Sequence, residues 1–449
     1  MPVADEQQID SAQDGARRWF WPRRWRTRVA AGSAVVALVA GGAAWLDRER
    51  IAGDFIDDYL VANGVPATYD IVAIGPRVQV IEHLVVGDPA RPDLTARRMV
   101  VELGVGWAGP EVRRVTLDGV RMFGSYREGQ FSLGALDPLV FTDSAEPPAL
   151  PAIDVVVNDA RALIESDFGA VGITLDGAGR LDDGFAGTLA ATAPGIGVEG
   201  CRVERATLYG KLTTASGAPS LSGPLRVSDL ACGGASMARA DIGTALSLKR
   251  DFTGAEADLV VEGAGIAMAG VAGDALSGTV KVNWGESGLA IAHDLALANV
   301  AVPQGRLASL SADGAWRGPS DASRGQWEGT LRGAGLVPAA DLTASLAAAE
   351  RGLDGTLLAP LLAKARGGMD RALTGSRFSA EAIVRHKRGE IALIIPEAAL
   401  TSRAGTRVLA LSQINAGIAD EGISGLRGNI LAGGEDLPSI NGRIEQEAG

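Results

Sequence analysis

The residues of this chain that could do chemistry are few and lie far apart. The three histidines, His83, His293 and His386, form no H-E-x-x-H or H-x-H pattern, so the sequence predicts no zinc site. No glycine-rich stretch ends in G-K-[ST], and no G-x-S-x-G elbow is present. We therefore predict that the protein is not an enzyme and that it holds no metal and no cofactor.

Cys201 and Cys232 are the only cysteines in the chain. In an oxidising compartment such an isolated pair can form a disulfide between neighbouring strands, which requires Cα atoms within about 7 Å of each other. The alternative is two small buried thiols that pack as apolar side chains. We predict that the two cysteines lie on neighbouring strands and can be oxidised together.

Acidic residues followed directly by glycine recur along the chain. Carboxylate pairs can act as general acid and base, but turn formation explains these dipeptides more simply. Glycine accepts positive φ at no steric cost, and Asp-Gly is a strong hairpin signal. The dipeptides therefore predict strand ends at Asp118-Gly119, Glu128-Gly129, Asp176-Gly177, Asp183-Gly184, Glu262-Gly263, Asp313-Gly314, Glu328-Gly329 and Glu421-Gly422.

Between these dipeptides, apolar and polar residues alternate with period two through residues 65–335, which predicts β-strands. Strand-turn-strand units without intervening helices predict a mostly β protein with one long antiparallel sheet. Alternation by itself occurs in any half-buried sheet and does not say which face is concave. The candidate residues for an apolar inner face are Met99, Val101, Leu103 and Val105 in RRMVVELGVGW, and Val280 and Val282 in TVKVNW.

The composition favours a sheet with many turns over a compact core of large side chains. The chain of 449 residues contains 60 glycines, and only 5% of its residues are aromatic. Its formal net charge of −12 argues against nucleic-acid binding, since phosphate contacts require Lys and Arg. We expect no nucleic-acid partner.

Val29–Leu46 contains no charged residue and reaches the length of about 18 residues that can span a bilayer. The arginines before it, from Arg17 to Arg28, favour a cytoplasmic location for that end of the span. The sequence predicts a cytoplasmic tail over 1–28, a transmembrane anchor over 29–46 and a stalk helix over 47–64. A cleaved signal is the main alternative, because Gly42-Ala43-Ala44 offers small residues for cleavage. A buried soluble helix is the third reading.

Residues 336–374 interrupt the alternation with an Ala- and Leu-rich segment of helical spacing. Gly355 and Pro360 divide it into two predicted helices at one end of the sheet, and we expect their Leu and Met face to pack on apolar strand residues. They either pack on the sheet as a helical pair or act as a gate over an apolar groove. Alternation resumes over 375–449, which predicts that the sheet continues.

Several strings resemble the N-terminal part of the YdbH family of AsmA- and TamB-like bacterial envelope proteins: VVGDPARPDLTARRMVVELGVGW, VRRVTLDGVRMFGSYREGQFSLGALDPL, LDRERIAGDFIDDYLVANGVPATYDI and LDGTLLAPLLAKARGGMDRAL. The resemblance covers most of residues 25–400. It implies a single-pass inner-membrane protein whose C-terminal part is periplasmic, with a long sheet curled into a groove. It further implies that phospholipid acyl chains move through this groove between the inner and outer membranes, with outer-membrane or periplasmic proteins as further partners.

Two functions from different classes therefore stand. The first is phospholipid transport, in which a curled sheet keeps acyl chains out of water at about 0.8 kcal/mol per buried CH₂. The second is a membrane-tethered scaffold of envelope assembly that carries no lipid. The first predicts an open apolar concavity, and the second predicts a flat or sandwiched sheet with a closed core.

Overall fold

The computed structural model describes residues 64–446, apart from 76, 107–108, 129, 141–148, 199, most of 341–358, 388–389, 420–421 and 435–436. The predicted tail (1–28), the anchor (29–46) and all but the last residue of the stalk (47–64) lie outside the described residues. Of the helices within the described residues, none has the length and apolar character that crossing a membrane requires.

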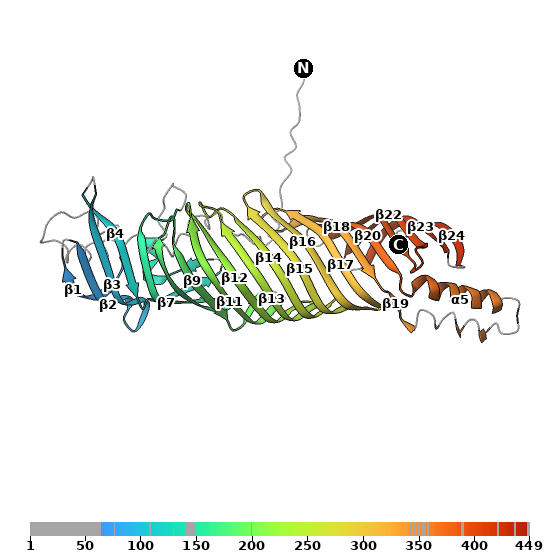
Figure 1. The fold of residues 1–449 in the computed structure, drawn as a ribbon, viewed down its shortest axis with the longest axis horizontal. Coiled ribbons are helices and arrows are strands. Elements are labelled where there is room, and N and C mark those ends of the chain that lie inside the picture. Colours follow the sequence, from blue (N-terminus) through green and yellow to red (C-terminus); the bar gives the residue numbers. More distant parts are fainter. Residues whose placement is uncertain are drawn as a thin grey trace, which may run out of the picture.

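The described residues form one sheet of 24 strands, and these strands lie across the long axis (Figure 1). This confirms the mostly β fold and the long antiparallel sheet. The first part contains β1 (Ala67–Ile74), β2 (Val78–Asp88), β3 (Arg91–Gly106), β4 (Gly109–Asp118), β5 (Arg121–Arg127), β6 (Gln130–Ser132), the short helices η2 (Gly134–Leu136) and α3 (Asp137–Val140), β7 (Asp154–Ser166), β8 (Gly169–Arg180), β9 (Ala186–Ala193) and β10 (Ile196–Val198).

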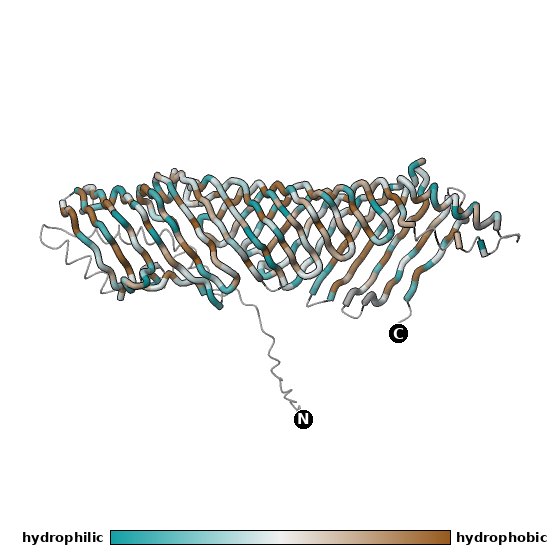
Figure 2. The backbone as a smooth tube through the Cα atoms, turned by 90° about the horizontal axis from the view of Figure 1, so that it is seen from below, coloured by the Kyte–Doolittle hydropathy of each residue, from teal (hydrophilic) through white to brown (hydrophobic). Residues whose placement is uncertain are grey.

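The middle part consists of long strands of similar length joined by short connections: β11 (Cys201–Ala215), β12 (Ala218–Cys232), β13 (Ala235–Leu248), β14 (Ala255–Met268), β15 (Val271–Gly285), β16 (Gly288–Val302), β17 (Gly305–Gly318) and β18 (Arg324–Ala334). The last part contains β19 (Val337–Pro338), α5 (Ala359–Leu373), β20 (Arg377–Lys387), β21 (Glu390–Thr401), β22 (Arg407–Ala419), β23 (Gly422–Gly434) and β24 (Leu437–Glu445). In projection the middle strands cross one another, because the bent sheet presents a near and a far wall (Figure 2).

The prediction of a long antiparallel sheet is wrong for one strand. β7 pairs in parallel with both β4 and β5. Parallel neighbours need a crossover connection, and here the chain returns through β6, η2 and α3 before β7 begins. Asp159 lies at positive φ in β7, where Arg121 of β5 donates to its carboxylate at 2.8 Å. This hydrogen bond from Arg121, with Arg161 nearby, holds the pKa of Asp159 below its ordinary value.

A close-packed core lies where this crossover covers the first strands. Leu133 and Leu136 of the crossover belong to one buried apolar cluster with Met99, Val101 and Val115. Other members of the core come from β2 and β3, including Ile81 and Leu94. The first part of the sheet therefore encloses a buried apolar core.

The helical insert does not interrupt the sheet. β18 pairs directly with β20 in antiparallel register, so the residues between them leave the sheet and return to it. Helix α5 contacts β19 and β24 at one end of the sheet (Figure 1). Ala372 is buried and Met369 is half-buried, whereas the segment before α5 is described only in part. The prediction of two packed helices therefore remains untested for its first helix.

Four of the acidic-Gly dipeptides do not lie at strand ends, so the turn interpretation is wrong for them. Asp176-Gly177, Glu262-Gly263, Asp313-Gly314 and Glu328-Gly329 lie within β8, β14, β17 and β18. In each dipeptide the acidic side chain is exposed and the glycine is half-buried. These residues follow the alternation of the strand, with the charge on one face and the glycine on the other.

Candidate functional site

The candidate site is the face of the sheet that carries the half-buried residue of each alternating pair, which we call the inner face. Directly opposed partners form rows across successive strands. One row crosses from β11 to β21 without a polar side chain: Leu208, Leu225, Ile242, Val261, Gly278, Leu295, Ala312, Leu331, Ala380 and Ala398. A parallel row is equally apolar: Leu212, Leu221, Leu246, Ala257, Val282, Ile291, Trp316, Trp327, Val384 and Leu393.

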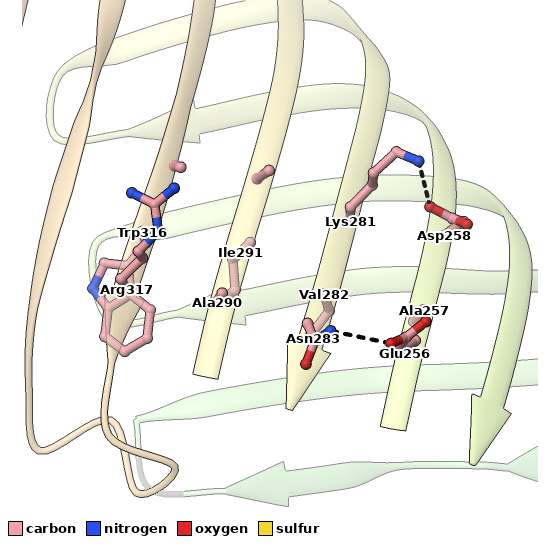
Figure 3. A pocket seen from close by; sticks show the side chains of 12 residues that line it. Glu256, Ala257, Asp258, Lys281, Val282, Asn283, Ala290, Ile291, Trp316 and Arg317 are labelled. Atoms are coloured by element: carbon pink, nitrogen blue, oxygen red, sulfur yellow. Dashed lines mark hydrogen bonds and ion pairs between the residues drawn. The ribbon is translucent and has the colours of Figure 1, made fainter. Parts of the chain in front are cut away.

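The opposite, outer face is polar and held by charge pairs between neighbouring strands. Lys281 contacts Asp258 at 3.0 Å, and the Asn283 amide donates to Glu256 at 3.2 Å (Figure 3). Asp241 accepts from both Arg239 and Arg226, and the Arg239 hydrogen bond holds the pKa of Asp241 below its ordinary value. The two faces therefore differ in kind, with charge outside and almost none inside.

Most residues on the inner face of the middle strands are half-buried, although Val300 and Leu307, at one end of β16 and β17, are buried. In β14 the burial alternates between half-buried and exposed, and no residue of this strand is fully buried. Val280 and Val282 of β15 are likewise half-buried, between the exposed Thr279, Lys281 and Asn283. Apolar rows that remain partly open to solvent are unusual, because monomeric proteins rarely expose large contiguous apolar patches.

An apolar cavity of about 430 Å³ lies between the first strands and the ends of β11–β13. Ligand pockets have volumes of about 300–1,000 Å³. Met99, Val115 and Phe185 border the cavity from the first part of the sheet, and Leu212 and Phe252 border it from the middle part. Because Leu212 also belongs to an apolar row of the inner face, the cavity continues that face toward the core.

The six predicted inner-face residues separate into two environments. Met99 and Val101 are each 3% exposed and belong to the core, although Met99 also borders the cavity. Leu103 is half-buried and packs against the same core. Val105 lies in β3, and its side chain is not described. Val280 and Val282 lie together on the partly open inner face of β15, far along the sheet from the others.

Sequence reasoning did not single out two tryptophans of the inner face. Trp316 in β17 and Trp327 in β18 are directly opposed partners. The Trp327 indole donates to Nε2 of His293 at 2.7 Å, and the His386 ring stacks on Trp316 with centroids 6.2 Å apart. A signal was present in the sequence, since GAWRG and GQWEG repeat the spacing G-x-W-x-G, which places Gly, Trp and Gly on one face of a strand.

Cys201 and Cys232 are directly opposed at the ends of β11 and β12, where their Cα atoms lie 3.9 Å apart and their sulfurs are bonded. The bond closes the open end of this hairpin, opposite its turn. No cysteine in the chain remains free. No group of three or more His, Cys, Asp or Glu side chains within the described part of the chain is arranged to hold a metal ion.

Replacing both cysteines with serine is expected to destabilise the β11–β12 hairpin by about 2 kcal/mol, because the unfolded chain has more conformations when the disulfide is absent. Alkylation of the wild-type protein without reductant should modify neither thiol. Modification of both thiols under these conditions would show that the pair is reduced in the native protein.

The fold places the chain among elongated proteins built on a single β-sheet with one apolar and one polar face. The chain belongs to the YdbH-like family, because the family model described as "Intermembrane phospholipid transport protein YdbH" matches residues 35–449. No curated protein and no solved structure matches the chain. The family is one of intermembrane phospholipid transport proteins, which indicates a location in the cell envelope.

Proposed function

We propose that this protein carries phospholipids between the inner and outer membranes, with their acyl chains on the inner face and their headgroups toward solvent. The observation that supports this most directly is the set of apolar rows across β11–β21, whose residues are half-buried rather than enclosed in a core. Each CH₂ that such a face removes from water contributes about 0.8 kcal/mol. The family assignment supplies the ligand class.

The curvature of the sheet supports a continuous path for acyl chains. The bent strands form two walls (Figure 2), and the rows run perpendicular to the strands, along the length of the molecule. Few polar side chains interrupt them: one neighbouring row holds Thr244 and His293. His293 does not face the path as a free polar group, because both ring nitrogens have hydrogen-bond partners.

In this proposal residues 29–46 anchor the protein in the inner membrane, and the described sheet lies in the periplasm. The apolar segment and its arginine-rich flank support this arrangement. A reporter enzyme that works only outside the cytoplasm should be active when fused after residue 64. A mature protein that begins near Ala44 would contradict the anchor.

The proposal predicts that the protein purified from native membranes contains phospholipid. Extraction and mass spectrometry should detect roughly stoichiometric glycerophospholipid, because an apolar path of this kind is costly to leave in contact with water. Maltose-binding protein carried through the same purification is the control. Protein that is folded and free of lipid would favour the scaffold alternative, in which the inner face serves protein partners.

A further inference from the structure

Three aromatic rings on the inner face lie over glycines rather than between bulky neighbours, and we call Trp316, Trp327 and Phe378 the aromatic cluster. A Cβ added at Gly314 would meet the Trp327 ring at 2.9 Å, and one at Gly329 would meet it at 2.7 Å. Gly314 and Gly329 are directly opposed partners. The Trp327 ring therefore covers a pair of glycines on neighbouring strands.

The other two rings of the cluster have the same relation to glycine. Trp316 covers Gly318 and Gly325, and a Cβ at Gly325 would overlap the ring, 2.7 Å from its Nε1. Phe378 covers Gly333, where an added Cβ would lie 2.6 Å from Cδ1 of the ring. At Gly325 and Gly333 the three atoms nearest to an added Cβ all belong to the aromatic ring. At these two positions it is therefore the ring, and not a neighbouring backbone, that leaves room only for glycine.

Trp316 and Trp327 are paired residues on neighbouring strands, but their indole rings extend toward opposite ends of this strand pair. Trp316 covers the glycines at one end of the G-x-W-x-G segments, and Trp327 covers those at the other end. Rings that cover glycine lie along the sheet and add little height to its surface. If the residues beneath the rings were larger than glycine, the rings would project into the space above the inner face.

We propose that the glycines beneath the aromatic cluster keep its rings flat against the sheet, and that they thereby set the clearance for phospholipid acyl chains across β17–β20. This inference rests on the proposed function and adds the residues that set the width of the path. The G-x-W-x-G segments of β17 and β18 create this clearance for the two indoles, because the alternation of a strand places both glycines and the tryptophan on the same face. Hydrogen bonding to His293 holds the Trp327 ring in place.

The test variant is Gly325→Val, whose side chain should push the Trp316 ring away from the sheet. Valine is chosen because β-branched residues are favourable in strands. The matched control is Gly172→Val in β8, another half-buried strand glycine, where an added Cβ meets only Thr192 O at 3.9 Å. Photo-crosslinking amino acids at Ile242 in β13 and Leu393 in β21 report lipid on the two sides of the aromatic cluster. Cells labelled with radioactive orthophosphate supply the phospholipid.

In the wild type and in Gly172→Val, both positions should capture labelled lipid. In Gly325→Val, capture at the position beyond the cluster should fall about tenfold relative to the position before it, whichever end the lipid enters. Adding Trp316→Leu to Gly325→Val should restore capture, because the raised ring is then gone. This double variant also separates a blocked path from a damaged fold.

Equal capture at both positions in folded Gly325→Val would overturn the clearance proposal and leave the transport function standing. Loss of capture that Trp316→Leu does not restore would overturn it as well. Absence of labelled lipid at both positions in the wild type would instead contradict the proposed function itself.

Discussion

Replacing Val280 and Val282 together with aspartate is expected to remove bound phospholipid from the protein while its fold is retained. Both side chains lie half-buried on the partly open inner face, so the carboxylates remain hydrated in the lipid-free protein. An acyl chain laid over them would desolvate two charges at about 2–3 kcal/mol or more each. Co-purified lipid should therefore fall more than tenfold, as measured by mass spectrometry.

The control for this variant introduces the same charge on the outer face. Val260 is 56% exposed in β14, and Ala275 is exposed in β15. Their strand partners are uncharged: Gly243 and Thr279 for Val260, and Ala264 and Ala298 for Ala275. Val260→Asp with Ala275→Asp should keep its lipid. If both double variants retain lipid equally, the inner face does not hold the acyl chains.

Val101→Asp is expected to unfold the first part of the sheet, although the sequence places Val101 in the same alternating class as Val280. Val101 is 3% exposed and opposes the fully buried Val115. An unpaired carboxylate in this core should cost about 4–5 kcal/mol or more, at the upper end of single-substitution effects. Thermal unfolding and limited proteolysis should show early loss of residues 65–180.

Val260→Asp is the matched substitution for this measurement, since it makes the same chemical change at an exposed position. It should unfold close to the wild-type temperature. A Val101→Asp protein that resists protease as well as Val260→Asp does would show that the first strands are not a closed core. The contrast between Val101 and Val280 distinguishes filled from partly open regions of one sheet.

The sequence was sufficient to predict strands and their faces, because alternation is local and each face has one environment. It could not separate Met99 and Val101 from Val280 and Val282, because the difference comes from what covers the face. Leu133 and Leu136 close the core from a crossover distant in sequence, and period-two alternation carries no information about such a cover. The parallel pairing of β7 was missed for the same reason.

The acidic-Gly dipeptides show a second limit. Asp-Gly has two physical uses: it accepts the positive φ of a hairpin turn, and it puts a charge outside and a small residue inside within a strand. Gly184, at φ +94°, follows the first use, and Gly314, in mid-strand under Trp327, follows the second. For Asp313-Gly314 and Glu328-Gly329 the nearby tryptophans separate the two cases, and the G-x-W-x-G spacing was the available signal.

The neighbour-to-neighbour pairing of β11–β18 has a consequence for how the protein folds. Each of these strands pairs with the strand just before it, so its contacts are local and each closing loop is short. The sheet can therefore grow by addition at its edge, as a repeat array does, with each strand using the previous one as a template. β7 is different, because it must wait for the β6–α3 crossover to return. The slow step of folding should thus lie near the N-terminal end, and the remaining strands should follow in chain order.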